Sequence, residues 1–289
     1  MAGVLIVGCG DIGRRVAKLY RARGEAVSGT ARRPQRVAEL AAEGIAPVLV
    51  DLDDPASLDD LPTADALVFY LAPPPPAGMV DPRMNAFLSG PAGSRPPSRI
   101  VYVSTSAVYG DCGGEWVTEG RAPAPSTDRG RRRLAAERAL LDWQDATGIP
   151  VVILRVPGIY AAGRLPVRRL REGLPVLRAQ DSPYTNRIHA DDLAAVCVAA
   201  ADRGRPGAAY NVSDGHPSTM TDYFNRIADL LELPRPPAVD MAEARRVLSP
   251  GMLSFLQDSR RLDNRRMREE LGVTLRYPDL EAGLRSCRP

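Results

Sequence analysis

Three glycines near the N-terminus constrain the fold of this chain most strongly. An apolar run at residues 4–7 has the pattern of a buried strand, Gly8, Gly10 and Gly13 follow it, and a helical pattern then continues to about Arg23. In such a loop the first glycine permits a tight turn, the second lets a pyrophosphate approach the backbone, and the third lets the helix pack close to the strand. The loop therefore predicts a dinucleotide-binding site.

The start of the helix adds to this site and also raises a question. Unpaired N–H groups and the positive end of the helix dipole favour a bound phosphate, so Asp11 and Ile12 belong to the predicted site. A carboxylate beside a pyrophosphate is unfavourable unless it points away. We therefore expect the side chain of Asp11 to be turned from the ligand.

Short apolar runs alternate with helical patterns through the first half of the chain. This alternation predicts a doubly wound, mostly parallel α/β sheet of the Rossmann type. After Tyr160 the rhythm loosens, so we expect a dinucleotide-binding domain at residues 1–160 and a small C-terminal substrate lobe in 161–289, with 190–215 returning to the sheet. The predicted strands are residues 4–7, 26–29, 47–50, 66–71, 100–104 and 151–156, and the predicted helices include 34–43, 131–146 and 190–201.

Composition excludes several classes of function. The net charge is +3 for 289 residues, so nucleic-acid binding is not indicated as a property of the whole chain. Four scattered cysteines without a CxxC pair, and only two histidines, favour a reducing compartment and no metal site. No run reaches the roughly 18 apolar residues of a membrane helix. We expect a cytoplasmic monomer or homodimer that binds a small-molecule substrate, with neither nucleic acid nor membrane as a partner.

The end of the second strand bears on the choice of cofactor. NAD-binding folds place an acidic residue at this strand end. In this chain the strand end carries a hydroxyl and two guanidinium groups, which suit the 2′-phosphate of NADP: Thr30, Arg32 and Arg33. The alternative is that both arginines are solvated at a helix start, which would leave NAD as the cofactor. Asp51, after the third strand, could accept a hydrogen bond from the adenine amino group or cap a helix. The predicted cofactor site is completed by Leu52, Leu71, Ala72 and Pro73.

Hydroxyl groups follow the fifth strand, at the sheet edge where open α/β sheets bind ligands. Thr105 stands three residues before a Val-Tyr-Gly sequence, and further motifs occur at residues 117–119, 154–160 and 186–194. With these motifs the chain resembles an extended short-chain dehydrogenase/reductase of the NAD-dependent epimerase/dehydratase family over nearly its whole length. Its GxGxxG loop replaces the more usual GxxGxxG, which indicates an atypical branch.

The chain departs from that family at the catalytic motif. Active members carry Tyr-x-x-x-Lys about 20 residues after the Val-Tyr-Gly, followed four residues later by Glu. Glu137 sets the register here, so Arg129 falls on the tyrosine position and Arg133 on the lysine position. Arginine stays protonated and cannot act as a general acid or base, although Arg133 could bind the nicotinamide ribose. Of the family's catalytic group Thr105 alone matches, and the resemblance implies that it polarises the substrate oxygen.

Three hypotheses follow for the activity. The acid could have moved to Tyr109 or Tyr160, which the family pattern places near the cleft; hydride would then pass between nicotinamide C4 and a carbonyl or hydroxyl carbon, as in an oxidoreductase or epimerase. The protein could instead be a catalytically silent NAD(P)-binding sensor. Thirdly, the register could be wrong, but Lys18 is the sole lysine and no other Tyr-x-x-x-Lys exists.

The resemblance gives little support for a sugar-nucleotide substrate, because Thr185 stands where an arginine often binds the diphosphate, two residues before Arg187. The family pattern also assigns His189 and Asp192 a structural role, through capping and hydrogen bonds.

Overall fold

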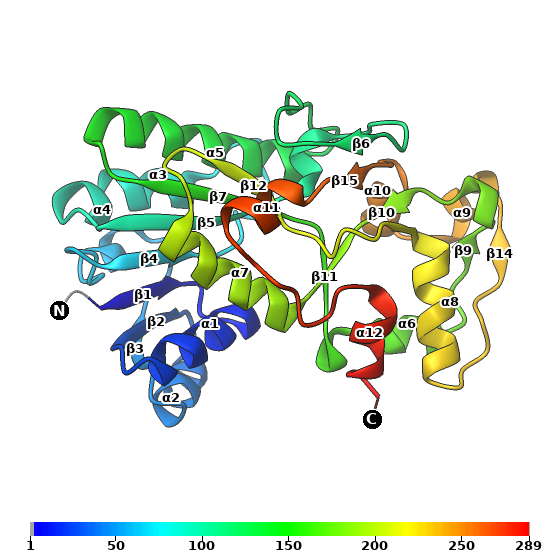
Figure 1. The fold of residues 1–289 in the computed structure, drawn as a ribbon, viewed down its shortest axis with the longest axis horizontal. Coiled ribbons are helices and arrows are strands. Elements are labelled where there is room, and N and C mark those ends of the chain that lie inside the picture. Colours follow the sequence, from blue (N-terminus) through cyan, green and yellow to red (C-terminus); the bar gives the residue numbers. More distant parts are fainter. Residues whose placement is uncertain (1–2, 289) are drawn as a thin grey trace.

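A seven-stranded sheet forms the centre of the structure, a computed structural model that describes residues 3–288 (Figure 1). Every neighbouring pair of its strands is parallel, which confirms the doubly wound α/β fold. Strand order reverses at β1, so a crevice opens beyond the carboxyl ends of β1 and its neighbour β4. In spatial order the strands are β3 (Ala46–Leu49), β2 (Val27–Ala31), β1 (Val4–Val7), β4 (Leu67–Tyr70), β5 (Arg99–Thr105), β7 (Val151–Val156) and β12 (Ala209–Asn211).

Helices cover both faces of the sheet, and this explains why its strands read as continuous apolar runs. All residues of β1 and β7 are buried. The first apolar core lies under α1 (Asp11–Ala22), α2 (Pro34–Ala42) and α7 (Ala190–Arg203). The second lies under α3 (Pro82–Ser89), α4 (Pro91–Ser94) and α5 (Asp128–Thr147) on the other face (Figure 1).

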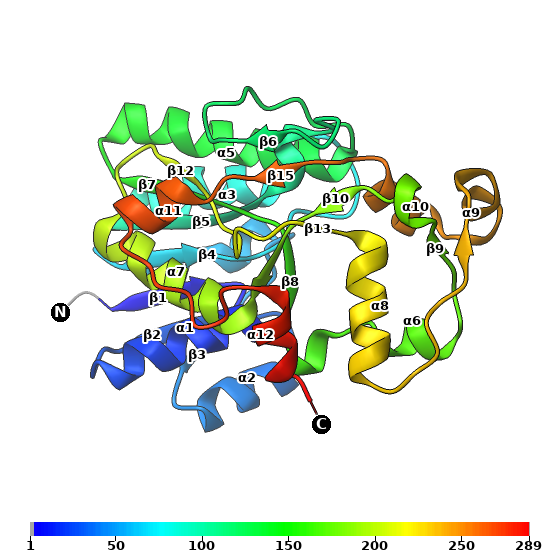
Figure 2. The same ribbon diagram turned by 45° about the vertical axis from the view of Figure 1, so that its right-hand side comes forward.

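Short strand pairs and helices make up the rest of the described chain, and many of them lie beyond the carboxyl edge of the sheet (Figure 2). The pairs are β8 (Gly158–Tyr160) with β11 (Arg187–His189), β10 (Tyr184–Thr185) with β13 (Ser218–Thr219), β9 (Val176–Leu177) with β14 (Ala238–Val239), and β6 (Trp116–Val117) with β15 (Arg261–Leu262). The remaining helices are α6 (Val167–Arg171), α8 (Met220–Leu230), α9 (Met241–Val247), α10 (Pro250–Leu256), α11 (Arg265–Glu270) and α12 (Leu280–Arg285). The 3-10 turns are η1 (Pro55–Leu58), η2 (Ser106–Tyr109), η3 (Ala162–Arg164) and η4 (Ala179–Asp181).

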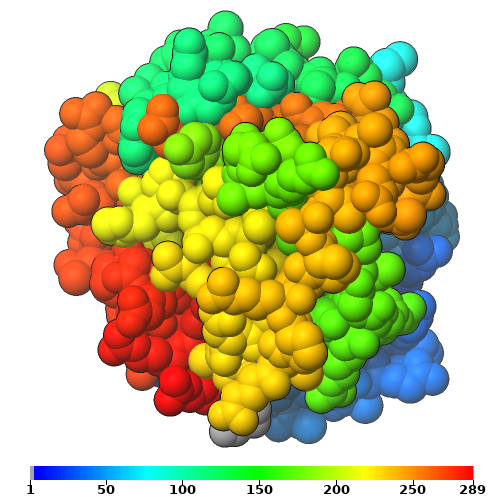
Figure 3. Space-filling view, turned by 90° about the vertical axis from the view of Figure 1, so that its right-hand side faces the viewer, coloured from blue at the N-terminus to red at the C-terminus, as the bar shows by residue number. Residues whose placement is uncertain are grey.

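The lobe and the sheet domain share the C-terminal half of the chain. Figure 2 shows α6, α8, α9 and α10 beyond the strand ends, whereas β15 and α11 run back along the sheet domain. Figure 3 shows the end face of the lobe, where green, yellow and orange segments from separate parts of the chain meet. The boundary at residue 160 stays a prediction. The chain beyond that residue is not all in the lobe, since β12 pairs with β7 and β15 with β6.

Several element boundaries differ from the sequence prediction by one to three residues, and two of the differences have a clear cause. The long helix α5 begins at Asp128 rather than Arg131, because the Thr127 hydroxyl accepts a hydrogen bond from the Gly130 N–H at 3.2 Å and so caps the helix. It ends at Thr147, one residue beyond the predicted end, and Gly148, with a φ of 75°, forms a left-handed cap. Strand β2 continues to Ala31, because its pairing with β3 extends that far. None of the described helices is long and apolar enough to cross a membrane.

A buried ion pair ties α5 to the sheet. Arg155 Nη2 on β7 lies 2.8 Å from Glu137 Oε2 on α5, with both side chains less than a tenth exposed. Ser104 of β5 donates a hydrogen bond to the same carboxylate. Arg155 Nη1 also donates to the Tyr109 hydroxyl at 2.9 Å, which donates in turn to Asn211 Oδ1 of β12 at 2.8 Å. This network joins three strands to α5 and fixes the register of the helix.

Glu137→Gln removes the charge that compensates Arg155 but keeps the shape of the side chain. Breaking one partner of a buried pair leaves an uncompensated charge, so we expect a loss of about 3–5 kcal/mol in the free energy of unfolding. Urea titration followed by circular dichroism measures it. Glu172→Gln is the control: its partner Arg168 is 90% exposed, so its effect should stay below about 0.5 kcal/mol. Equal effects of the two substitutions would contradict the role assigned to the buried pair.

Candidate functional site

One large cavity, of about 900 Å³, runs along the carboxyl edge of the sheet. It begins at the glycine loop between β1 and α1, passes the ends of β2, β4, β5 and β7 and the first turns of α5, and ends among α8 and α10 of the lobe. Thus the predicted cofactor loop and the predicted catalytic strand end open into the same space.

The three glycines of the loop have different surroundings. Gly8 has a φ of +85°, and a Cβ there would lie 2.6 Å from the backbone nitrogen of Ala72. A Cβ on Gly13 would lie 2.9 Å from Ile6 Cγ2, whereas one on Gly10 would meet no atom within 4 Å. Packing therefore requires Gly8 and Gly13, while Gly10 faces open space in the cavity. The loop is held by Thr30, whose hydroxyl accepts a hydrogen bond from the Gly8 N–H at 2.8 Å.

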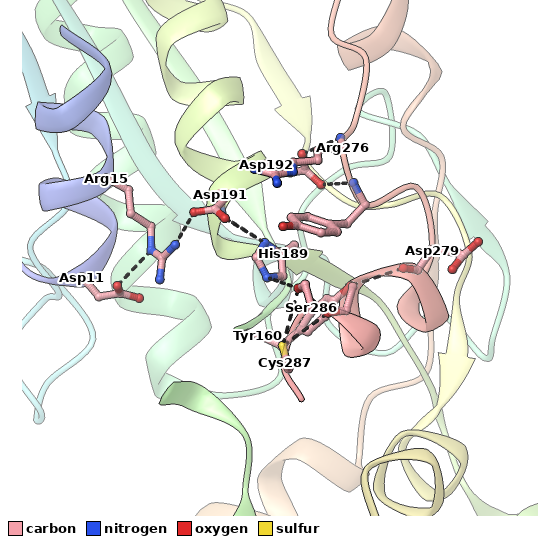
Figure 4. Close-up of polar contacts among 12 residues, drawn as sticks. Asp11, Arg15, Tyr160, His189, Asp191, Asp192, Arg276, Asp279, Ser286 and Cys287 are labelled. Carbon is pink, nitrogen blue, oxygen red and sulfur yellow. Dashed lines mark hydrogen bonds and ion pairs between the residues drawn. The ribbon is translucent and has the colours of Figure 1, made fainter. Parts of the chain in front are cut away.

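Arginines hold the Asp11 carboxylate. Its Oδ1 lies 3.0 Å from Arg15 Nε on the same helix, and its Oδ2 lies 3.1 Å from Arg164 Nη1 of η3. Figure 4 shows Asp11 turned toward Arg15, which also pairs with Asp191 of α7. Because the carboxylate is engaged by cations, it presents less repulsion to a phosphate at the start of α1.

At the end of β2 the arrangement differs partly from the prediction. Arg32 lines the cavity and pairs with Asp51 at 3.2 Å and Asp53 at 3.5 Å. Arg33 is exposed at the N-cap of α2 and does not line the cavity, whereas Arg36 does. Of the predicted pair, Arg32 alone lines the cavity, and Arg36 joins it there; the role of Arg32 and Arg33 toward a phosphate stays a prediction.

The remaining predicted cofactor residues divide into two groups. Ile12, Leu71 and Pro73 line the cavity. Asp51, Leu52 and Ala72 are not among its lining residues. The Asp51 carboxylate faces Arg32, Leu52 packs on the second core, and Ala72 packs against Gly8.

Thr105, Arg129 and Arg133 all line the cavity. The Thr105 hydroxyl caps η2 by accepting from the Ala107 N–H at 3.3 Å. Arg133 Nη1 donates to the carbonyl of Val103 at 2.8 Å, which holds the guanidinium against the end of β5. Arg129 and Arg133 are one helical turn apart on α5 and open into the same space, in agreement with the register set by Glu137.

The two tyrosines proposed as relocated acids do not reach the cavity. Tyr109 is 1% exposed, its hydroxyl is engaged by Arg155 and Asn211, and burial raises its pKa to about 12. Tyr160 is fully buried, its hydroxyl donates to the Asp279 carbonyl at 3.4 Å, and burial raises its pKa too. This corrects their placement near the cleft. Both side chains hold the core together, since their hydroxyls are hydrogen-bonded within it.

His189 and Asp192 anchor the C-terminal segment (Figure 4). His189 Nδ1 accepts from the Asp191 N–H at 3.2 Å, so a neutral ring carries its proton on Nε2, which lies 3.5 Å from Ser286 Oγ. With a proton on Nε2 the imidazole cannot act as the base toward that serine. Asp192 accepts from the N–H groups of Arg276 and Tyr277 at 2.8 and 2.9 Å. The contacts favour the structural role implied by the family pattern.

The lobe contributes residues that sequence analysis did not assign to the site. Arg187 is 7% exposed and lies 4.1 Å over the ring of Tyr223. Arg260 pairs with Asp258 at 2.9 Å, and both are buried. Arg187 lies within the motif at residues 186–194, but no motif marks Asp258 or Arg260. Arg36 could have been found four residues after Arg32.

Charge along the cavity is unbalanced. Arginines line it from Arg14 and Arg32 at one end to Arg187 and Arg260 at the other, whereas Asp11 and Asp258 are the carboxylates among its described lining residues. Both of these carboxylates are already paired with arginine. At the glycine-loop end the lining arginines are paired with carboxylates outside the lining: Arg14 with Glu43, Arg32 with Asp51 and Asp53, and Arg36 with Glu39. Arg129, Arg133 and Arg187 have no carboxylate partner among the described residues, so the part of the cavity toward the lobe is suited to an anionic ligand.

Residues 4–213 match the model of the NAD dependent epimerase/dehydratase family. The chain belongs to this family. It is 29% identical over 293 residues to Protein YeeZ of Escherichia coli, a match that covers 96% of this chain and 97% of that protein. Among solved structures, a functionally unknown conserved protein from Silicibacter pomeroyi has a TM-score of 0.85, 34% identity and coverage of 99% and 98% of the two chains. MoeE5 in complex with UDP-glucose and NAD has a TM-score of 0.77, 23% identity and coverage of 99% and 97%, a likeness of fold.

Gly10→Val tests the glycine loop. The new side chain meets no protein atom at Cβ, so we expect the thermal midpoint to fall by a few degrees at most, while dinucleotide binding is lost because the side chain enters the space for the pyrophosphate. Calorimetric titration with NAD and NADP, beside thermal unfolding, measures both. Gly13→Val is the contrast: its Cβ collides with Ile6, so it should destabilise the fold strongly. Undiminished affinity in Gly10→Val would place the cofactor elsewhere.

Proposed function

We propose that this protein is an NAD(P)-dependent oxidoreductase or epimerase acting on a small carbonyl or hydroxyl compound, or on a sugar-type substrate. The observation that carries the proposal is the single cavity that joins the glycine loop to Thr105 and to the lobe. MoeE5, which shares the fold, is described with NAD and UDP-glucose bound. Because loop, strand end and lobe open into one space, a dinucleotide on the loop and a substrate under the lobe would meet at Thr105.

NADP is the cofactor that we favour. Arg32 and Arg36 line the cavity at the end of β2, and the strand end carries no acid that would repel a 2′-phosphate. Asp51 and Asp53 pair with the two terminal nitrogens of Arg32, and a 2′-phosphate would share the guanidinium with them. The residues present thus fit a phosphorylated ribose.

Replacing Arg32 and Arg36 together by alanine should remove the preference for NADP over NAD. A charge-assisted contact to phosphate contributes roughly 1.5–3 kcal/mol, so we expect a ten- to hundredfold loss in NADP affinity and little change for NAD. Titration calorimetry with both dinucleotides measures it. Arg33→Ala is the matched control, since Arg33 is exposed and does not line the cavity. Tighter binding of NAD than NADP by the unaltered protein would refute the preference.

Reduction of a carbonyl group needs a proton donor, and tyrosine side chains of the lobe line the cavity. The nicotinamide, when bound, would supply or accept a hydride. Tyr184 and Tyr223 are the tyrosines among the described residues that line the cavity. Burial raises the pKa of Tyr223, and the Arg187 guanidinium, which lies over its ring, offsets part of that rise by stabilising the phenolate. We assign the acid to Tyr223 because it lines the cavity and has this cation beside it. The Thr105 hydroxyl would polarise the substrate oxygen that receives this proton.

Tyr223→Phe should lower the turnover of carbonyl reduction by about 10²–10⁴-fold and leave NADPH binding unchanged. The measurement is oxidation of NADPH, followed by absorbance, against a panel of small aldehydes, ketones and keto acids. Tyr109→Phe is the comparison: it should lower stability through the Arg155 network and leave the turnover of the folded fraction unchanged. If NADPH binds and no compound of the panel is reduced, the assignment as a reductase of small carbonyl compounds fails, and a cofactor-binding sensor is favoured.

A further inference from the structure

Arg129 occupies the position at which the family places its acid, and it differs from the other arginines nearby. Arg133 donates to the Val103 carbonyl, and Arg260 pairs with Asp258 and donates to the Ser106 carbonyl. Among the described residues no hydrogen bond or ion pair is made by the Arg129 guanidinium. Its contact is with an aromatic ring, Phe255 of α10, whose centroid is 4.2 Å from Cζ. The charge is therefore free to bind a ligand.

The surroundings of Arg129 favour an anion. Removal from water, followed by repulsion from Arg260 and Arg133, lowers the pKa of Arg129, and the nearby Asp258 offsets only part of this. Arg129 also lies in the first turn of α5, the positive end of the helix dipole, where a further cation is unfavourable. An oxyanion at this point would relieve both repulsions.

Geometry narrows the kind of anion. The guanidinium packs against the face of Phe255, and its N–H groups lie in its own plane, where they match the two oxygens of a carboxylate. Arg133, one turn further along α5, is fixed beside Val103 two residues before Thr105. Arg129 stands at the sequence position of the family's acid and lines the same cavity as Thr105, so an anion on Arg129 would lie near a carbon held at Thr105.

We propose that Arg129 is a substrate-binding residue that takes a carboxylate attached beside the reacting carbon, so that the substrate is a small 2-oxo or 2-hydroxy acid. This rests on the proposed function, since it places a reacting carbon at Thr105. The replacement of tyrosine by arginine then changes the role of the position. The residue at this position, Arg129, would orient an anionic substrate and would not transfer a proton. Tyr223 of the lobe would supply the proton.

The test uses oxamate, a non-reacting analogue of a 2-oxo acid, titrated calorimetrically into the full chain with and without NADPH. Arg129→Met keeps the apolar stem and should weaken oxamate binding ten- to hundredfold, whereas Arg129→Lys, which keeps the charge but loses the planar fork, should fall between. Arg131→Met is the matched control: Arg131 is exposed, pairs with Asp128 at 2.7 Å, and its loss should leave oxamate binding unchanged. Thermal unfolding of each variant shows that it is folded.

Failure has distinct forms. Equal oxamate affinity in Arg129→Met and the unaltered chain, or no binding to the unaltered chain at millimolar concentration, overturns the proposal. Tighter binding of inorganic phosphate than of oxamate overturns the assignment to a carboxylate. If NADPH fails to bind while oxamate binding depends on Arg129, the proposed function is wrong and the carboxylate site stands.

Discussion

The buried pair of Glu137 and Arg155 is the interaction on which the site depends. A carboxylate and a guanidinium removed from water are stable only when each compensates the other and further hydrogen bonds complete them, as Ser104 and Tyr109 do here. Because the pair joins α5 to β5 and β7, it fixes both the rotation and the axial position of the helix. Arg129 and Arg133 reach the cavity as a consequence of that constraint.

The same constraint explains why Tyr109 is unsuited to acid–base chemistry. Its hydroxyl accepts from Arg155 and donates to Asn211, so both hydrogen-bonding functions of the phenol are used within the core. A proton donor must instead face the cavity. The lobe meets that condition, since α8 brings Tyr223 to the cavity beside Arg187 of β11.

Arginine side chains line the cavity at both ends. The cofactor end is lined by Arg14, Arg32 and Arg36, and the lobe end by Arg129, Arg187 and Arg260. Cations at close quarters repel one another, so a bound anion stabilises the arrangement. Carboxylates pair with the three arginines at the cofactor end and with Arg260. Arg129 and Arg187 have no such partner among the described residues, so the lobe end is the more basic of the two.

The sequence by itself determined the parallel sheet, the glycine loop and the register of α5, because each depends on local patterns: apolar runs, glycines at fixed spacing and a glutamate four residues after Arg133. Local spacing also placed Thr105, Arg129 and Arg133 at the sheet edge. Tertiary structure decided which side chains share the cavity. Arg36 lines the cavity and Arg33 does not, Tyr109 and Tyr160 are buried in the core, and Tyr223, Arg187 and Arg260 line the cavity from the lobe. These contacts join residues that are distant in the sequence. They depend on how helices and strands pack in space, which local sequence patterns do not specify.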